Sequence, residues 1–230
     1  MKLNVYLARC GVASRRGADE LIKKGKVQVN GKRTLEPYTE IKEDDIVTVR
    51  NRPVSPAKYV YIALNKPKGY ISTIKDRFAE KKVIDLVPRS YGKLFYVGRL
   101  DKNSSGLMIL TNDGQFAQHL SHPSFQVEKE YEVFLSPSYD PGHTPILKTG
   151  IIDDGEKLRV VSIRALKRFP RRTLLSVVMK EGKKREVRRI FEHFGYRVID
   201  LKRVRIGKIL LGETKTGQYR LLTEKEKQVK

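Results

Sequence analysis

The chain has 230 residues, of which 48 are lysine or arginine and 26 are aspartate or glutamate, so its formal net charge is +22. Hydrophobic residues make up 39% of the sequence, which supports a folded core and excludes a disordered tail. A positive excess of this size indicates a polyanionic partner, with nucleic acid favoured over an anionic membrane surface.

Cysteine, histidine and apolar patterns exclude further classes of protein. Cys10 is the only cysteine, which rules out an intrachain disulfide, and the histidines have no spacing typical of a metal site. No apolar run approaches the length that crosses a membrane. The N-terminal stretch MKLNVYLARCG lacks the apolar region and cleavage site of a signal peptide. We expect a cytoplasmic, metal-free monomer with no membrane partner.

Two short helices are predicted at the N-terminus. Leu3 and Leu7 have helical spacing, and Gly11 is placed to end that helix. Ser14 is a typical N-cap for the next helix, and Gly25 suits its C-terminal end.

A hairpin follows these helices and completes a module over residues 1–50. Val27-Gln28-Val29 alternates as a strand does, Asn30-Gly31 is a strong hairpin turn, and the apolar residues of 46–49 supply a closing strand. The helices, the basic turn at Ser14-Arg15-Arg16 and the VNGK hairpin resemble the S4-like RNA-binding domain. The alternative is a small α/β appendage whose charges keep it soluble.

Composition divides the rest of the chain into three parts. Residues 51–58 contain two prolines, which disfavour helix and strand pairing, and are predicted to be a linker. Residues 59–222 are rich in strand patterns and are predicted to be a second domain. Residues 223–230 are predicted to be a charged tail.

The stretch Phe95–Gly114, FYVGRLDKNSSGLMILTNDG, predicts two strands joined by a polar turn. Asp101 lies in that turn, close to an arginine. A carboxylate held between rigid elements can act as a nucleophile or a general base. An aspartate in a turn can instead hydrogen-bond its own backbone, and the local pattern alone favours that interpretation.

Two further stretches have clear periodicity. Lys129–Leu135 alternates with period two, which places Tyr131, Val133 and Leu135 on one face of a strand. Glu181–Gly195, EGKKREVRRIFEHFG, predicts a helix with one apolar face and an arginine cluster at its start. Arginines at a helix N-terminus are typical of a phosphate site, although a solvated basic face is the common alternative.

Taken together, these motifs resemble those of bacterial ribosomal RNA pseudouridine synthases, in the subgroup that modifies 16S or 23S rRNA and carries an S4-like domain. The segments GRLD, SSGLMILTNDG, Lys129-Glu130-Tyr131 and EGKKREVRR match the family in order. The resemblance implies that Asp101 is the catalytic carboxylate, that Tyr131 stacks on the target uracil and that Arg188 pairs with Asp101. Glu186 stands where the family has glutamine.

The resemblance also implies the fold, the partner and the RNA contacts. We expect an α+β chain, with a small S4-like domain followed by a mainly antiparallel-sheet catalytic domain with a central cleft. The predicted partner is ribosomal RNA. The residues predicted to bind it are Arg15, Arg16, Lys26, Lys32, Arg99, Lys129, Lys183, Lys184, Arg185 and Arg189.

Pseudouridylation breaks the N-glycosidic bond of a uridine, turns the uracil and joins C5 to C1′, so it needs no cofactor. The absence of a phosphate loop or a dinucleotide turn from the sequence agrees with that expectation. A glycosidic bond is broken with the help of a carboxylate, and a target base must leave its stack for an aromatic platform. The predicted target is 23S rRNA, with 16S rRNA as the alternative.

Two other classes compete with this hypothesis. A non-catalytic RNA-binding or ribosome-assembly protein would show the same charge. A DNA-binding regulator would use a helix-turn-helix over residues 3–24. Neither class explains why GRLD, the lysine–tyrosine motif and EGKKREVRR occur together.

Overall fold

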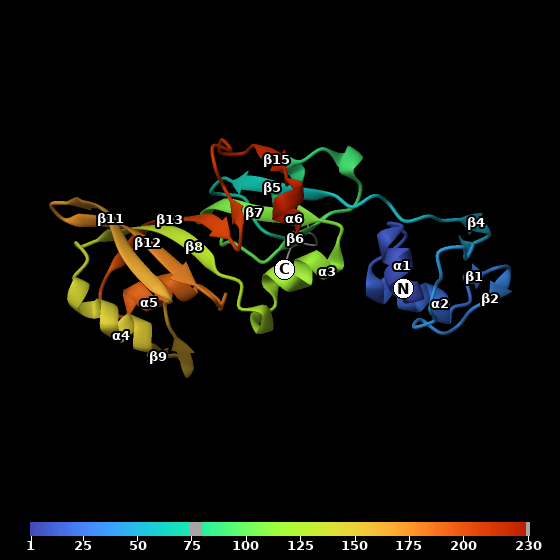
Figure 1. Cartoon of the computed structure of the whole chain (residues 1–230), viewed down its shortest axis with the longest axis horizontal. Helices are drawn as coiled ribbons and strands as arrows, with labels where there is room; N and C mark the ends of the chain where they lie inside the picture. Colours follow the sequence, from blue (N-terminus) through green and yellow to red (C-terminus); the bar gives the residue numbers. More distant parts are fainter. Residues whose placement is uncertain (74–79, 229–230) are drawn as a thin grey trace. The chain divides into compact units, whose positions relative to one another are not determined.

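The structure, a computed structural model, describes residues 1–73 and 80–228 (Figure 1). The chain divides into two units, each of which is described by itself. The first comprises Met1–Tyr59 with Arg89–Lys93, and the second comprises Val60–Pro88 with Leu94–Lys230.

The first unit packs two helices on a small antiparallel sheet. Its elements are α1 (Leu3–Arg9), α2 (Arg15–Lys23), β1 (Val27–Val29), β2 (Lys32–Arg33), β3 (Val47–Val49) and β4 (Arg52–Pro53), with the sheet order β2-β1-β3-β4. The Ser14 hydroxyl accepts a hydrogen bond from the Gly17 amide at 3.2 Å, as the N-cap prediction requires. Leu3, Leu7 and Ile22 are fully buried in its core.

The predicted linker begins with a strand. Pro53 pairs with Thr48, and Arg52 pairs with Val49, so β4 is an edge strand of the small sheet. The turn before it has positive φ angles at Arg50 and Asn51, the geometry of a tight hairpin. A proline is tolerated at an edge because its missing N–H leaves no ladder bond unmade. The prediction that residues 51–58 cannot pair is therefore wrong for Arg52–Pro53.

The second unit is built on a nine-stranded sheet whose main order is β11-β12-β8-β13-β7-β5-β15, with β14 on β13 and β6 on β7. Every adjacent pair is antiparallel except β13 and β7. The predicted mainly antiparallel sheet is confirmed. The strands are β5 (Tyr61–Lys66), β6 (Phe95–Val97), β7 (Ser105–Thr111), β8 (Lys129–Ser136), β11 (Ser162–Phe169), β12 (Arg172–Met179), β13 (Arg197–Ile206), β14 (Ile209–Leu210) and β15 (Tyr219–Leu221).

Strands β13 and β7 meet only briefly, and we call this contact the seam. Their parallel register pairs Lys202 with Ser105 and Arg203 with Gly106. Gly106 has φ +101°, and a Cβ there would lie 2.2 Å from the Arg203 carbonyl oxygen, so only glycine fits. The seam brings the turn before β7 close to β13 and also to β8, which is the neighbour of β13 on its other side.

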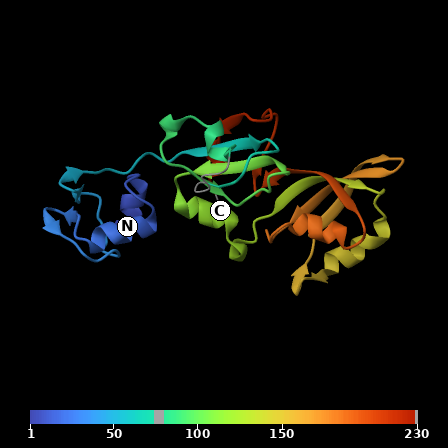
Figure 2. The ribbon, with the colours of Figure 1, turned by 180° about the vertical axis from the view of Figure 1, so that it is seen from behind.

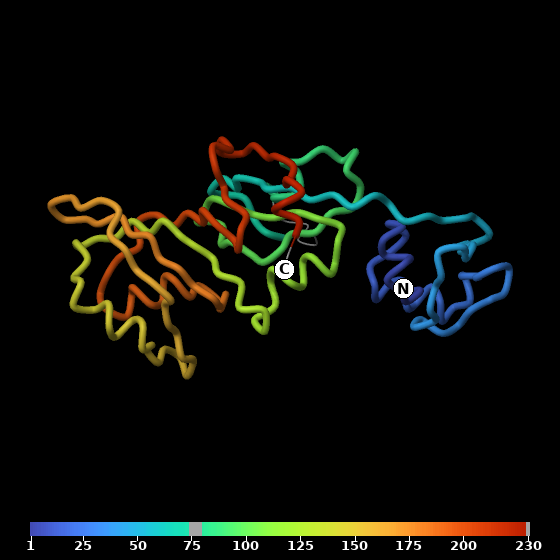
Figure 3. Tube along the Cα trace, in the orientation of Figure 1, coloured from blue at the N-terminus to red at the C-terminus, as the bar shows by residue number. Residues whose placement is uncertain are grey.

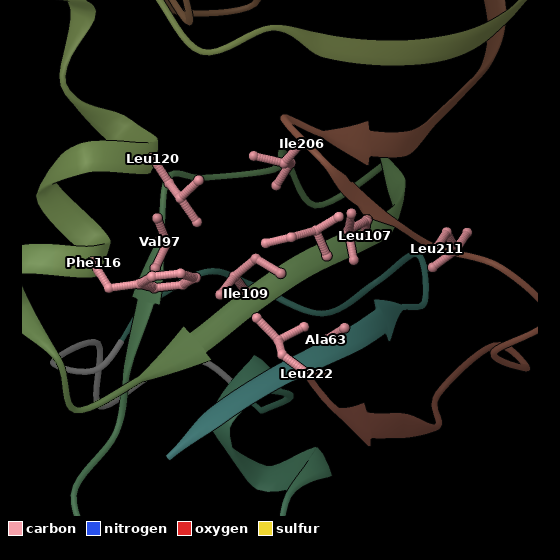
Figure 4. Close-up of a cluster of buried hydrophobic side chains, with 10 residues drawn as sticks. Ala63, Val97, Leu107, Ile109, Phe116, Leu120, Ile206, Leu211 and Leu222 are labelled. Carbon is pink, nitrogen blue, oxygen red and sulfur yellow. The ribbon is translucent and has the colours of Figure 1, made fainter. Parts of the chain in front are cut away.

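Short helices cover the sheet on either side of the seam. They are α3 (Gly114–Ser121), α4 (Thr144–Thr149), α5 (Glu186–Glu192) and α6 (Glu224–Lys227). The same unit has 3-10 turns at Val83–Leu86, Pro123–Phe125 and Pro141–His143 and a small ribbon of β9 (Ile151–Asp153) and β10 (Glu156–Leu158), while the 3-10 turn Arg89–Tyr91 belongs to the first unit. Both ribbon views place α4 and α5 on the same side of the β11-β12-β8-β13 half (Figures 1 and 2). On the other half, Phe116 and Leu120 of α3 pack on Leu107 and Ile109 of β7 (Figure 4).

The C-terminal segment is more ordered than the predicted charged tail. The red end of the trace in Figure 3 returns to the sheet, where β15 pairs with β5. Thr223 then caps α6, and Glu226 binds Arg220 at 2.7 Å. The capping box formed by Thr223 and Glu226 explains this helix, and the tail prediction overlooked that pattern. Among the described residues, no helix is long and apolar enough to cross a membrane.

Candidate active site

A pocket of about 500 Å³ opens at the seam, and we call it the seam pocket. The turn before β7, the start of β8, the middle of β13 and the start of α5 all contribute to its wall. Seven of the residues predicted from sequence to act or to bind RNA line it: Arg99, Asp101, Lys129, Tyr131, Lys183, Lys184 and Arg185. The fold thus brings motifs from distant parts of the sequence to one cavity.

Asp101 lies in the turn between β6 and β7 with an exposed side chain. Its main-chain carbonyl accepts hydrogen bonds from the Lys66 ammonium group at 3.1 Å and from the Ser104 amide at 3.1 Å. Within residues 1–73 and 80–228, its carboxylate forms no ion pair. The backbone of the turn is held, while the carboxylate faces the pocket.

The group that holds this turn is Lys66, the last residue of β5, which has no exposed surface. Its Nζ donates to the carbonyl oxygens of Ser104 at 2.7 Å, Pro67 and Asp101 at 3.1 Å, and Lys102 at 3.5 Å. Burial lowers the pKa of this ammonium group to about 8, against the opposing effect of Asp101. In the sequence, Lys66 belongs to Asn65-Lys66-Pro67-Lys68-Gly69, a pattern that predicts a structural turn but does not show that the Lys66 side chain holds the Asp101 turn.

Tyr131 and Lys129 lie on β8, on the far side of the pocket from the turn. Tyr131 is buried with Val133 and Leu135, which confirms the predicted period-two face. It is opposite Arg203 in the register of β8 and β13. The Lys129 Nζ donates to the carbonyl oxygens of Val127 at 3.1 Å and Lys180 at 3.4 Å, and burial lowers its pKa.

Arg188 makes different contacts from those that the resemblance implied. It is 9% exposed, and its guanidinium donates to the carbonyl oxygens of Val198 at 3.1 Å and Asn103 at 3.4 Å. Among the described residues it forms no ion pair with Asp101, so the predicted pairing is absent from this structure. A motif shows which residues come together but cannot show which acceptor a buried guanidinium takes. Arg188 ties α5 to the turn that carries Asp101.

Arg189 was predicted to bind RNA, but acidic partners surround it. Its guanidinium contacts the carboxylates of Asp153 and Glu156, both at 2.5 Å, and the Asp153 carbonyl oxygen at 2.6 Å. Hydrogen bonds to Glu156 and Asp153 raise its pKa. The ribbon of β9 and β10 packs beside α5, a long-range contact that helix periodicity cannot reveal. Arg189 braces that ribbon and does not line the pocket.

Three basic residues follow one another at the rim of the pocket, directly before α5. Lys183 pairs with Glu181 at 2.8 Å, and Arg185 pairs with Glu192 at 3.3 Å. Lys184 is exposed. With exposed Arg99 on the opposite wall, they give the entrance a positive field suited to a phosphate backbone.

Glu186 is the carboxyl group buried in the pocket wall, 5% exposed. One of its oxygens accepts from the Lys183 amide at 3.1 Å, and the other has no partner in the described part of the chain. Burial raises its pKa to about 7, with Glu181 acting in the same direction and Lys183 and Lys129 opposing it. The position where the family has glutamine therefore holds a carboxyl group that is partly protonated near neutral pH.

We expect Glu186→Gln to stabilise the protein in a pH-dependent way. The folded state holds the Glu186 proton up to a pH of about 7, and the unfolded state holds it only to about 4.5. The contribution of Glu186 to the free energy of unfolding is therefore greatest below pH 4.5 and is lost as the pH rises through 7. Glutamine removes this loss. At about pH 8 the variant should be more stable by about 1–3 kcal/mol, and the difference should vanish near pH 4.

Denaturant unfolding at several pH values measures this difference. The control is Glu192→Gln, because Glu192 is an exposed residue of the same helix. A Glu186→Gln difference that is equal at low and high pH would contradict the raised pKa.

Comparisons with known proteins agree with the geometry. The signature described as RNA pseudouridylate synthase matches residues 60–193, and that of the S4 domain matches residues 1–47. An uncharacterized RNA pseudouridine synthase of Aquifex aeolicus is 37% identical over 229 residues, which cover 98% of this chain and 92% of the relative. The ribosomal large subunit pseudouridine synthase B of Bacillus subtilis is 36% identical over 230 residues, covering 98% and 93%. A crystal structure of a pseudouridylate synthase superposes with a TM-score of 0.70 at 26% identity, covering 99% and 98%.

The S4 domain and the synthase fold define an enzyme that acts on RNA. The chain belongs to the RNA pseudouridine synthase family. It is an isomerase with an N-terminal S4 domain, which confirms the predicted fold, family and enzyme class. The non-catalytic binder and the DNA-binding regulator, the two alternatives open from sequence, are both wrong.

Proposed function

We propose that this enzyme isomerises a specific uridine of ribosomal RNA, in the 23S RNA of the large subunit, at the seam pocket. The observation that carries the proposal is that Asp101 and Tyr131 line one cavity at the seam. Similarity over nearly the whole chain to a Bacillus subtilis synthase named for the large ribosomal subunit favours 23S over 16S RNA. Because the proposed substrate is ribosomal RNA, the proposal includes the predicted cytoplasmic location.

In the proposed mechanism, Asp101 acts on the sugar of a uridine that has left its stack. Its carboxylate stabilises or traps the electron-poor C1′ as the N1–C1′ bond breaks. Tyr131 supplies the aromatic surface on which the uracil lies. The pocket needs to retain the uracil while it turns, because C5 of the same base then bonds to C1′. The Asp101 turn keeps its place through Lys66 and Arg188, which bind its carbonyl groups.

Tritium release tests the function and the target together. Ribosomal RNA labelled at C5 of uridine should release about one tritium per 23S molecule and none from 16S RNA, because the C5 hydrogen is lost when C5 bonds to C1′. Release from 16S RNA alone would overturn the large-subunit assignment and leave the isomerase standing. No release from either RNA, free or within ribosomal subunits, would contradict the ribosomal proposal.

The first unit provides the second part of the proposal, a surface that binds RNA away from the chemistry. Arg15 and Arg16 lie in the first turn of α2, Lys26 precedes β1 and Lys32 begins β2, all four with exposed side chains. Clustered cations of this kind neutralise phosphates and release counterions on binding.

Replacing Arg15 and Arg16 together with glutamine should weaken RNA binding and leave the chemical step unchanged. The slope of log affinity against log salt should become shallower by about 1–2. Filter binding at several salt concentrations measures the slope, and exposed Lys225 on α6 provides the control as Lys225→Gln. An unchanged slope would rule out phosphate contacts by these two residues.

A further inference from the structure

Arg203 is a buried arginine at the centre of the seam. It is 2% exposed, and its register places it between Gly106 of β7 and Tyr131 of β8. It also lines the seam pocket with Asp101. No role for Arg203 follows from the sequence, because only the pairing of β13 with both neighbours reveals its position.

Two nitrogens of its guanidinium are anchored, and the third is buried without a partner among the described residues. Nε donates to the Leu107 carbonyl oxygen at 2.8 Å, and Nη1 donates to the Arg99 carbonyl oxygen at 3.4 Å. Nη2 is buried and has no hydrogen-bond partner in the part of the chain that the structure describes. A buried charged donor without an acceptor is costly, so such a group in a pocket indicates a missing ligand.

The charges around Arg203 favour an acceptor that gains negative charge. Arg203 contributes to the lowered pKa of both Lys66 and Lys129, so both cations lie near it, and Lys129 lines the seam pocket with it. When the N1–C1′ bond breaks, its electron pair leaves with the uracil, whose carbonyl oxygens O2 and O4 then carry negative charge. C5 next bonds to C1′, the C5 hydrogen leaves as a proton to water, and N1 takes up a proton from water. A fixed donor aimed at developing charge accelerates such a step.

Resting on the proposed function, we propose that Arg203 is a further catalytic residue, whose Nη2 donates to a carbonyl oxygen of the uracil and stabilises the anion formed when the base leaves the sugar. Two anchored nitrogens hold the guanidinium still, so little reorganisation accompanies the reaction. Asp101 acts on the sugar from the turn, Tyr131 supports the ring, and Arg203 binds the oxygen.

Arg205 on the same strand is a matched control. The register of β13 shifts between Arg203 and Arg205, so Arg205 pairs with Glu130 at 2.9 Å and does not line the seam pocket. Both residues are arginines of one strand, and of the two only Arg203 lines the seam pocket.

The experiment compares Arg203→Gln, Arg203→Lys and Arg205→Lys in single-turnover reactions on ribosomal RNA transcripts. Arg203→Gln should slow formation of the C5-linked isomer by about 10²–10³-fold, with the RNA dissociation constant within about threefold of wild type. Arg203→Lys keeps the charge without the planar fork, so its rate should lie between those of Arg203→Gln and wild type. If the glutamine variant does not fold, the lysine variant alone tests the proposal. Arg205→Lys should react like wild type.

Transcripts with 2-thiouridine or 4-thiouridine separate contact with the base from support of the turn. Sulfur is a weaker acceptor than oxygen, so one of the two substitutions should slow the wild-type enzyme by about fivefold or more and add no further loss to the Arg203 variants. Equal effects of the thio substitutions on wild type and variants would overturn the proposal, as would wild-type rates in both Arg203 variants. If Asp101→Asn is inactive while the Arg203 variants react at the wild-type rate, this inference alone is overturned. If Asp101→Asn reacts at the wild-type rate, the proposed function is overturned.

Discussion

Asp101→Asn should lower turnover by at least about 10³-fold and leave RNA affinity close to wild type. Asparagine keeps the size and hydrogen-bonding capacity of aspartate but cannot stabilise a positive centre at C1′ or bond to it. The fold should tolerate the change, because the turn is held by its main-chain carbonyl to Lys66 and not by the Asp101 side chain. Single-turnover isomer formation and filter binding measure the two quantities separately.

The control for this change is Asp154→Asn. Asp154 is exposed in the turn between β9 and β10, has a positive φ angle that asparagine adopts readily, and does not line the seam pocket. This variant should react like wild type. If Asp101→Asn isomerises RNA at a rate comparable with that of Asp154→Asn, the carboxylate of Asp101 is not required for the reaction.

Local signals predicted the small elements of the first unit well. Ser14 caps α2, and Asn30-Gly31 forms the turn between β1 and β2, because both depend on the chemistry of a few adjacent residues. The strand Arg52–Pro53 escaped prediction for the opposite reason. Proline disfavours pairing in general, but a free sheet edge accepts it, and the sequence does not show which strand lies at an edge.

The sequence predicted several residues that line the seam pocket, but not the contacts that they make. Motif order indicated that Asp101 and Tyr131 act together, and the fold places both at one pocket. Arg188 and Arg189 show why contacts are harder to predict than members of a site. Although they are adjacent in one helix, Arg188 binds a carbonyl group of the Asp101 turn, and Arg189 binds the acids of the β9–β10 ribbon. Which acceptor each takes depends on contacts between segments that are distant in sequence.

The contacts of Lys66 and Arg203 were not predicted because they depend on the seam. Lys66 ends a largely apolar strand, whereas Arg203 is one of five charged residues in β13, so its burial cannot be seen in the sequence. The sheet order explains both side chains. Because β7 lies between β5 and β13, Lys66 of β5 and Arg203 of β13 both reach carbonyl groups around the start of β7.

Of the substitutions that we predict to change stability, Lys66→Met should be the most destabilising. Methionine fills the space but leaves the carbonyl oxygens of Pro67, Asp101, Lys102 and Ser104 without their shared donor. Buried acceptors left in this state cost on the order of 3 kcal/mol in the free energy of unfolding. For a domain of this size, that loss lowers the melting temperature by about 6–12 °C.

The Asp101 turn should also lose its position, so turnover should fall sharply at temperatures where the Lys66→Met variant remains folded. The matched control is Lys68→Met, two residues along, where a half-exposed lysine pairs with Asp200 at 2.8 Å. A surface pair of this kind contributes at most about 1 kcal/mol, so that variant should melt and react nearly as wild type does. Thermal unfolding and single-turnover rates of both variants decide the matter. If Lys66→Met melts no lower than Lys68→Met, the ammonium group does not hold the turn, because the four carbonyl groups would then have found other donors.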